Sequence, residues 1–213
     1  MSTLVASPAP PTTRPRRRLL PAVLATAGIA LVVLGAVTTL RGYAPLMATD
    51  AFDAEGPAHT RVDGIGGEDV WVVDYTDAEA VTYAFALRNG GPFTTTVMAI
   101  DLPAPGPLRM LQPVEVGLLP EGAEVDAGAP SQAFAPFALG PGEVRVVVVR
   151  GYFTNCEEVT ERAISILDGH LVHHTTAGID GATRVDLPVH VVNRSPTRVE
   201  CRGRPSDRSH RQS

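Results

Sequence analysis

Three histidines in the segment GHLVHHTT are the residues whose type and spacing best suit metal chemistry: His170, His173 and His174. Residues four apart on a β-strand point to the same face, so His170 and His174 share one face and His173 points to the other. With His190 on the next predicted strand, two or three imidazoles can converge on a zinc or copper ion. The alternative is that these histidines are polar side chains on the solvent face of a hairpin.

The chain holds two cysteines, Cys156 and Cys201, which allow one intramolecular disulfide if they lie in an oxidising compartment. The bond would fasten the C-terminal segment to the strand before Cys156. Closing a loop of about 45 residues stabilises a fold by roughly 4 kcal/mol in the chain-entropy model. Two free thiols, or an intermolecular or redox-active pair, are the alternatives. No C-x-x-C motif favours thiol exchange.

Motifs of nucleophilic and phosphate chemistry are absent from the sequence. It contains no G-x-S-x-G, S-x-x-K or H-E-x-x-H, and a phosphate-binding loop would lack its lysine because all 18 basic residues are arginine. Residues 42–200 carry 9 Arg against 22 Asp and Glu, a net charge of −13. An acidic domain gains nothing from a phosphate backbone, so we expect no nucleic-acid partner. We also expect no enzyme activity and no cofactor.

A segment without charge, Leu19–Leu40, is the strongest signal in the sequence. Its 22 residues would form a helix of about 33 Å, enough for a hydrocarbon core of about 30 Å. We therefore predict a transmembrane helix over residues 19–40. A cleaved signal peptide is the alternative, although its apolar stretch is usually only about 7–15 residues long. Both possibilities export the C-terminal part.

Arginine sets the predicted orientation. Four arginines precede the span, and only Arg41 follows it closely; the four are Arg14, Arg16, Arg17 and Arg18. The positive-inside rule then places residues 1–18 in the cytoplasm and the rest of the chain outside, in a protein of the plasma membrane with a single span.

Residues 41–68 are rich in Gly, Pro and acids and are predicted to be a linker. Beyond them the apolar residues alternate with period two, which is typical of strands. The Asn89-Gly90 pair predicts a turn, and Pro113 predicts a sheet edge or a bulge. Strands are predicted over residues 69–74, 79–89, 94–102, 109–119, 143–153, 163–167, 169–176 and 183–193. A loop over residues 177–182, AGIDGA, would join the last two.

Seven to nine strands without a long amphipathic helix predict an all-β fold, an antiparallel β-sandwich, with a barrel as the alternative. Within residues 79–89, Val81, Tyr83, Phe85 and Leu87 would share one face. The same alternation places Thr82, Ala84, Ala86 and Arg88 on the opposite face.

Two stretches carry a resemblance. FALRNGGPFTTTVMAI resembles the strand, Asn-x-Gly, strand unit of bacterial immunoglobulin-like modules, and FAPFALGPGEVRVVVV resembles their later turn-and-strand element. The whole arrangement is similar to uncharacterised actinobacterial single-span membrane proteins with an immunoglobulin-like extracytoplasmic domain, over roughly residues 69–193. The resemblance implies an immunoglobulin-like sandwich and brings no catalytic residues. The Cys, Trp, Cys order of antibody domains is absent, because Trp71 precedes both cysteines.

The expected organisation is a cytoplasmic basic tail (1–18), a transmembrane helix (19–40), a linker (41–68), an extracytoplasmic sandwich (69–201) and a disordered tail (202–213). We expect a structural or binding module of the bacterial cell envelope whose partner is a protein or a wall component. The alternatives are a metal-handling module that uses the His cluster and an accessory subunit of a membrane complex.

Overall fold

The structure is a computed structural model that describes residues 34–35, 38, 43–56, 59–63, 69–102, 110–154, 156–157, 159–197 and 201. The chain divides into two compact units, residues 1–39 and 40–213. The predicted span, Leu19–Leu40, lies almost entirely outside the described residues, as do the arginines before it and the tail 202–213. Within the described part of the chain, no helix is both long and apolar enough to cross a bilayer.

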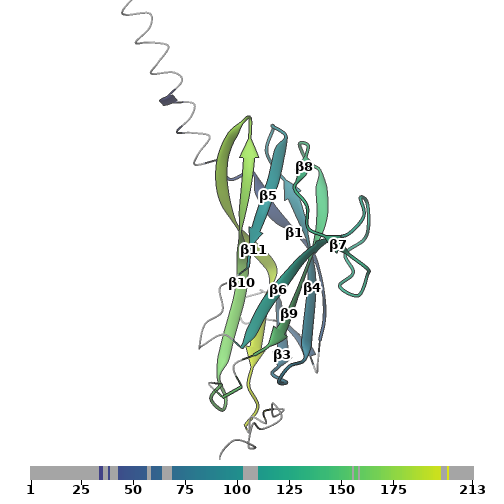
Figure 1. Ribbon diagram of the computed structural model, residues 1–213, viewed down its shortest axis with the longest axis vertical. Coiled ribbons are helices and arrows are strands. Elements are labelled where there is room, and N and C mark those ends of the chain that lie inside the picture. Colours follow the sequence, from purple (N-terminus) through teal and green to yellow (C-terminus); the bar gives the residue numbers. More distant parts are fainter. Residues whose placement is uncertain are drawn as a thin grey trace, which may run out of the picture. The chain divides into compact units, whose positions relative to one another are not determined.

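The described part of the second unit is a sandwich of two β-sheets (Figure 1). The five-stranded sheet has the order β1 (Leu46–Glu55), β4 (Ala80–Asn89), β9 (Val144–Phe153), β6 (Leu111–Leu118) and β7 (Gln132–Ala133). The six-stranded sheet has the order β2 (His59–Asp63), β3 (Asp69–Asp74), β11 (Ile179–Arg194), β10 (Ile164–Thr176), β5 (Thr95–Asp101) and β8 (Phe137–Leu139). The prediction of an all-β sandwich is confirmed.

Several details differ from the predicted strands. The pairing of β3 with β11 is parallel, whereas the other described pairings are antiparallel. Residues 163–167 and 169–176 belong to one strand, β10, whose register with β11 shifts between Leu167 and Gly169. The predicted loop AGIDGA shrinks to Ala177 and Gly178, both at positive φ (50° and 77°), as in a tight two-residue hairpin turn. The predicted irregularity at Pro113 is confirmed as a bulge against β9.

Residues 41–68 are not merely a linker, because β1 and β2 lie within them. β1 pairs with β4 along most of its length, from Leu46 opposite Asn89 to Glu55 opposite Thr82. Its sequence, LMATDAFDAE, alternates poorly, since backbone pairing holds this edge strand and only a few side chains enter the core. Phe52 is one of them, with its ring centroid 6.2 Å from Trp71 and 6.3 Å from Tyr83.

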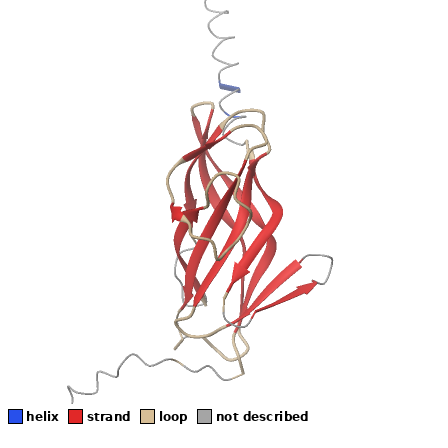
Figure 2. Cartoon of the chain, turned by 90° about the vertical axis from the view of Figure 1, so that its right-hand side faces the viewer, coloured by secondary structure: helices blue, strands red, loops and turns tan. Residues whose placement is uncertain are grey.

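The core between the sheets contains the face predicted for β4. Val81, Tyr83, Phe85 and Leu87 are fully buried there, opposite β11 residues such as Val185 and Val191. Figure 2 shows the long strands of the sandwich from the side. Alternation thus identified the buried face because side chains of a strand point to its two sides in turn.

The opposite face of β4 and β9 is also buried. Ala84, Ala86, Val146 and Val148 form a second apolar cluster with residues of the loop 119–131, which joins β6 to β7. The loop is fixed by the Ala127 amide, which donates to Asp53 Oδ2 at 2.7 Å. Burial on both faces explains why residues 146–149 of β9, VVVV, form a continuous apolar run instead of an alternating one.

Asn89 ties the two sheets together at one end of the sandwich. Its side chain is completely buried, and its Nδ2 donates to the carbonyls of Phe93 (2.8 Å) and Leu139 (2.9 Å). Its Oδ1 accepts from the Gly91 amide at 2.9 Å. Its backbone carbonyl accepts from Gly142, whose φ of 79° favours glycine. Asn89 therefore joins both stretches that carry the resemblance.

Asn89→Ala is expected to lower the free energy of unfolding by about 2–4 kcal/mol, because it leaves one buried carbonyl, one partly buried carbonyl and one buried amide without their partner. Urea unfolding of the full chain in detergent measures this. Gln132→Ala removes an amide from an exposed position of β7 and should change the free energy by less than about 0.5 kcal/mol. Equal small effects of both substitutions would contradict the role of Asn89.

Candidate functional site

The predicted His cluster lies on β10, with the alternation expected from the sequence. His170 and His174 point into the sandwich and are 1% and 2% exposed, whereas the His173 side chain points outward and is 44% exposed. The interpretation of all three as solvent-face residues is therefore wrong for His170 and His174. Alternation predicted which histidines share a face of the strand, but not that the face of His170 and His174 is the buried one.

His170 is hydrogen-bonded at both ring nitrogens. Its Nδ1 lies 3.2 Å from the Asp101 carbonyl, which can only accept, so Nδ1 carries the proton. The Tyr83 hydroxyl therefore donates to Nε2, at 2.8 Å. The imidazole also stacks between Tyr83 and Phe85, with both centroids 5.9 Å away. Burial lowers the pKa of His170 and raises that of Tyr83, which keeps the pair neutral.

His174 is held by threonines. Its Nε2 lies 2.9 Å from Thr183 Oγ1 and its Nδ1 lies 3.3 Å from Thr176 Oγ1. Thr176 in turn shares a hydrogen bond with Thr95 at 2.9 Å. Burial is the larger cause of a lowered pKa for His174, and the neighbouring His173 adds to it. Hydroxyl groups can donate or accept, so they satisfy either tautomer.

The three histidines do not converge on one point. His173 pairs with the Asp101 carboxylate at 2.9 Å on the surface, away from the buried nitrogens of His170 and His174. His190 lies on β11, opposite Val70 in the parallel pairing with β3. Among the residues that the structure describes, no three His, Cys, Asp or Glu side chains are grouped to hold a metal ion.

The two buried imidazoles predict a loss of stability in acid. Their pKa values are lowered in the folded chain, so the unfolded chain takes up protons first as the pH falls below about 6.5. The free energy of unfolding should then fall by up to about 1.4 kcal/mol per pH unit for each imidazole, until the folded pKa is reached. Urea titrations between pH 7.5 and 5.5 measure this slope. His170→Gln should reduce the slope by about half, and an unchanged slope would contradict the assignment.

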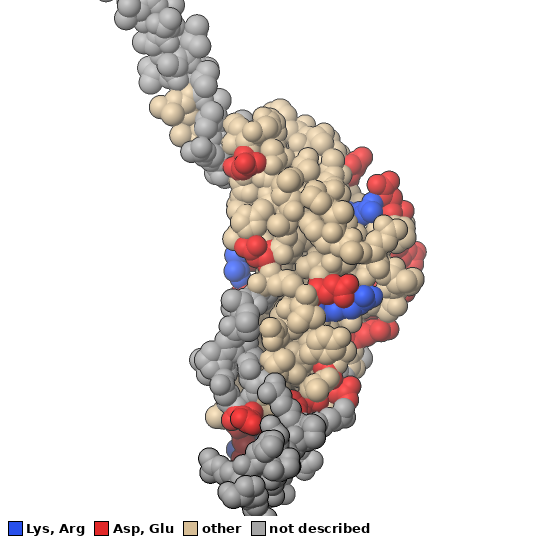
Figure 3. Space-filling view, in the orientation of Figure 1, with Lys and Arg blue, Asp and Glu red and all other residues tan. Residues whose placement is uncertain are grey.

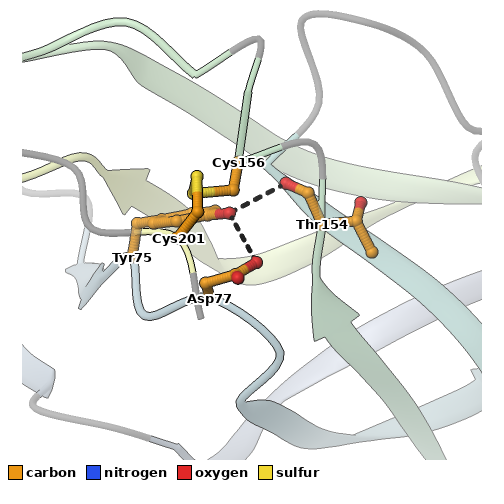
Figure 4. The surroundings of a disulfide bond; sticks show 5 residues. All are labelled: Tyr75, Asp77, Thr154, Cys156 and Cys201. Carbon is orange, nitrogen blue, oxygen red and sulfur yellow. Dashed lines mark hydrogen bonds between the residues drawn. A yellow bond between two sulfur atoms is a disulfide. The ribbon is translucent and has the colours of Figure 1, made fainter. Parts of the chain in front are cut away.

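The predicted disulfide is confirmed. Cys156, after β9, is bonded to Cys201, after β11, with their Cα atoms 5.5 Å apart (Figure 4). Beside it the Tyr75 hydroxyl lies 3.3 Å from Asp77 Oδ1 and 3.2 Å from the Thr154 carbonyl. Burial, followed by the charge of Asp77, raises the pKa of Tyr75. The bond secures the end of the chain that follows the last strand.

A cavity of about 270 Å³ opens between the sheets beside the first half of β10. Its lining includes Leu111 of β6, His170 of β10 and Asn193 of β11. It lies where β5 no longer flanks β10: in the described pairing, β5 faces only Leu171 to Thr176. At the mouth, Arg184 pairs with Asp168 at 2.7 Å. The cavity is therefore a recess with an apolar wall and a charged rim.

Asn193 makes this cavity a candidate binding site. The residue is 1% exposed, its Nδ2 reaches Ser165 Oγ only at 3.5 Å, and its buried Oδ1 has no hydrogen-bond partner. A buried carbonyl oxygen without a partner costs about 1–3 kcal/mol. It can accept a hydrogen bond from an N–H or O–H group of a ligand. The sequence could have indicated this residue, because Asn193 is a polar side chain on the face of β11 that otherwise carries Val185, Leu187, Val189 and Val191.

Asn193→Leu is expected to raise the free energy of unfolding by about 1 kcal/mol, because it replaces an unsatisfied buried amide by an apolar side chain of similar size. Urea unfolding of the full chain in detergent measures the change. Asn89→Leu is the matched control and should destabilise the protein, since the Asn89 amide is fully hydrogen-bonded. A large loss of stability for Asn193→Leu would mean that Asn193 is a structural residue.

Fold and site together define a two-sheet all-β protein with one disulfide and a lateral cavity. No model of a known protein family matches the sequence, and no curated protein matches it. Among solved structures, the ASH/PapD-like domain of human CEP192 is 8% identical, with 69% of this chain and 86% of that one covered and a TM-score of 0.26. A family 123 glycoside hydrolase from Clostridium perfringens is 7% identical, with 70% and 28% covered and a TM-score of 0.31.

Proposed function

We propose that this protein is a membrane-anchored, extracytoplasmic binding module of the bacterial cell envelope. Its sandwich is immunoglobulin-like, its anchor is the helix over residues 19–40, and it has no catalytic activity. Its partner is a protein or a wall component, and the cavity beside Asn193 is the place where a hydrogen-bond donor of that partner is held.

The Cys156–Cys201 bond is the observation that carries this proposal. Disulfides persist in oxidising compartments and are rare in the cytoplasm. The arginine cluster before the uncharged segment independently favours export of the same domain. The disulfide and the arginine cluster thus both support a position of the sandwich outside the cytoplasm.

The histidine chemistry supports a binding rather than a catalytic role. His170 and His174 are tied to Tyr83, Thr183 and a backbone carbonyl inside the sandwich. A general acid or base must reach a substrate atom directly or through one water. Each imidazole instead makes hydrogen bonds to its own buried polar neighbours, and a ligand in the cavity would meet the charged rim and Asn193.

Reporter fusions at Ser213 test the sidedness. Alkaline phosphatase, which is active only outside the cytoplasm, should be active in this position, and a green fluorescent protein should be dark when exported as an unfolded chain. Deletion of residues 19–40 is the control and should reverse both signals. The purified full chain should show no free thiol before reduction and two after it. Fluorescence with an inactive phosphatase, or two thiols without reductant, would contradict the proposal.

A further inference from the structure

The end of the sandwich where β1 begins is the end closest along the chain to the predicted span. Tyr43 follows Leu40 by three residues, so their Cα atoms are separated by at most about 11 Å. The Tyr43 side chain packs directly against Gly91, in the turn after β4. The covalent chain therefore keeps this turn near the point where the predicted span ends.

Three exposed side chains form a row next to that turn. Met47 of β1 lies opposite Arg88 of β4, and Arg88 lies opposite Val144 of β9. Residues directly opposite in antiparallel strands present their side chains on the same face. Met47 is 49% exposed and Val144 is 45% exposed, while Phe93, in the turn itself, is 50% exposed. Large apolar side chains thus lie on both sides of Arg88, and a third lies in the adjacent turn.

The charge of Arg88 is not neutralised within the described part of the chain. The other strand arginines whose side chains are described form ion pairs: Arg145 with Glu121, Arg150 with Glu115, Arg184 with Asp168, and Arg194 with Asp74. The acid next to Val144, Glu143, accepts instead from the Gly140 amide at 2.6 Å. Figure 3 shows mostly uncharged atoms over the upper part of this face, with an acidic group at its upper left edge and further acidic and basic groups lower down and to the right.

We propose that Met47, Arg88, Phe93 and Val144, here called the membrane-facing patch, rest on anionic lipid headgroups of the membrane that anchors the chain. Phe, like Trp and Leu, is common on protein faces that lie at the membrane interface, and an arginine near an anionic surface gains about 1 kcal/mol. The tether selects lipid as the occupant, because Met47 follows the predicted span by seven residues and the neighbouring strands place Arg88 and Val144 beside it. This inference rests on the proposed anchoring.

The patch also fixes which end of the domain faces away from the membrane. Thr95, just after the β4–β5 connection, pairs with Thr176 at the end of β10, so the β10–β11 turn lies at the same end as the patch. Ile164 and Arg194 pair at the opposite end, near the disulfide. The disulfide end is then the one that faces away, and the mouth of the cavity, toward that end, is open to a partner.

Tryptophan quenching in vesicles tests the contact. The full chain is reconstituted in phosphatidylcholine and phosphatidylglycerol with brominated acyl chains, as the Phe93→Trp variant and, for the control, as Ile166→Trp. Ile166 is 63% exposed on the first half of β10, so it matches Phe93 in exposure but not in place. Quenching of Phe93→Trp should be at least about twofold stronger, since only that position would lie at the bilayer interface. The buried Trp71 contributes equally to both variants.

Headgroup recognition is tested in the same vesicles. Adding Arg88→Glu to Phe93→Trp, or omitting phosphatidylglycerol, should bring quenching down toward the control. Equal quenching of the two single variants would overturn the proposal. Quenching that does not change with Arg88→Glu or with the removal of anionic lipid would also overturn it. So would emission that depends on the protein density in the vesicles, because a second copy of the chain would then cover the patch. Failure of the chain to float with the vesicles would refute the anchoring itself, whereas flotation without selective quenching refutes only the membrane-facing patch.

Discussion

Burial of the β4–β9 pair on both faces is the constraint on which the sandwich depends. On the inner side, Tyr83, Phe85 and Val147 meet the six-stranded sheet, and on the outer side Ala84 and Val148 are covered by the loop 119–131. The small alanines of β4 leave room for that loop. A sheet whose central strands are excluded from water on both sides cannot shift its register without exposing apolar side chains. The remaining strands are positioned around this pair.

The polar groups inside the sandwich follow from that constraint, since each buried donor or acceptor needs a partner. Asn89 satisfies the carbonyls at one end, Tyr83 and His170 satisfy each other, and His174 is shared among threonines. Asn193 Oδ1 is a described exception that borders the lateral cavity. The binding role proposed for the cavity and the structural role of the other groups therefore both follow from the requirement that buried polar groups have partners.

Most of the strands from residue 69 onward could be predicted from the sequence, because period-two alternation of apolar residues is a local property. The exceptions are the short strands β7 and β8, which were not predicted. Alternation also assigned Val81 and Tyr83 to one face and separated His173 from His170 and His174. It missed β1, whose place at the sheet edge depends on backbone pairing with β4. Alternation also could not tell which face of β10 is buried, so the surroundings of the histidines were not predicted. Nor did it single out Asn193 among its apolar neighbours.

The sequence by itself determined which residues form most of the strands, which side chains share a face, and that two cysteines allow one internal pairing. Only the tertiary structure decided that His170 and His174 face the core, that Asn89 joins the two sheets, and that an acceptor of Asn193 borders a cavity. The physical reason is that alternation defines two faces of a strand locally, whereas what covers each face is set by strands and loops distant in the chain.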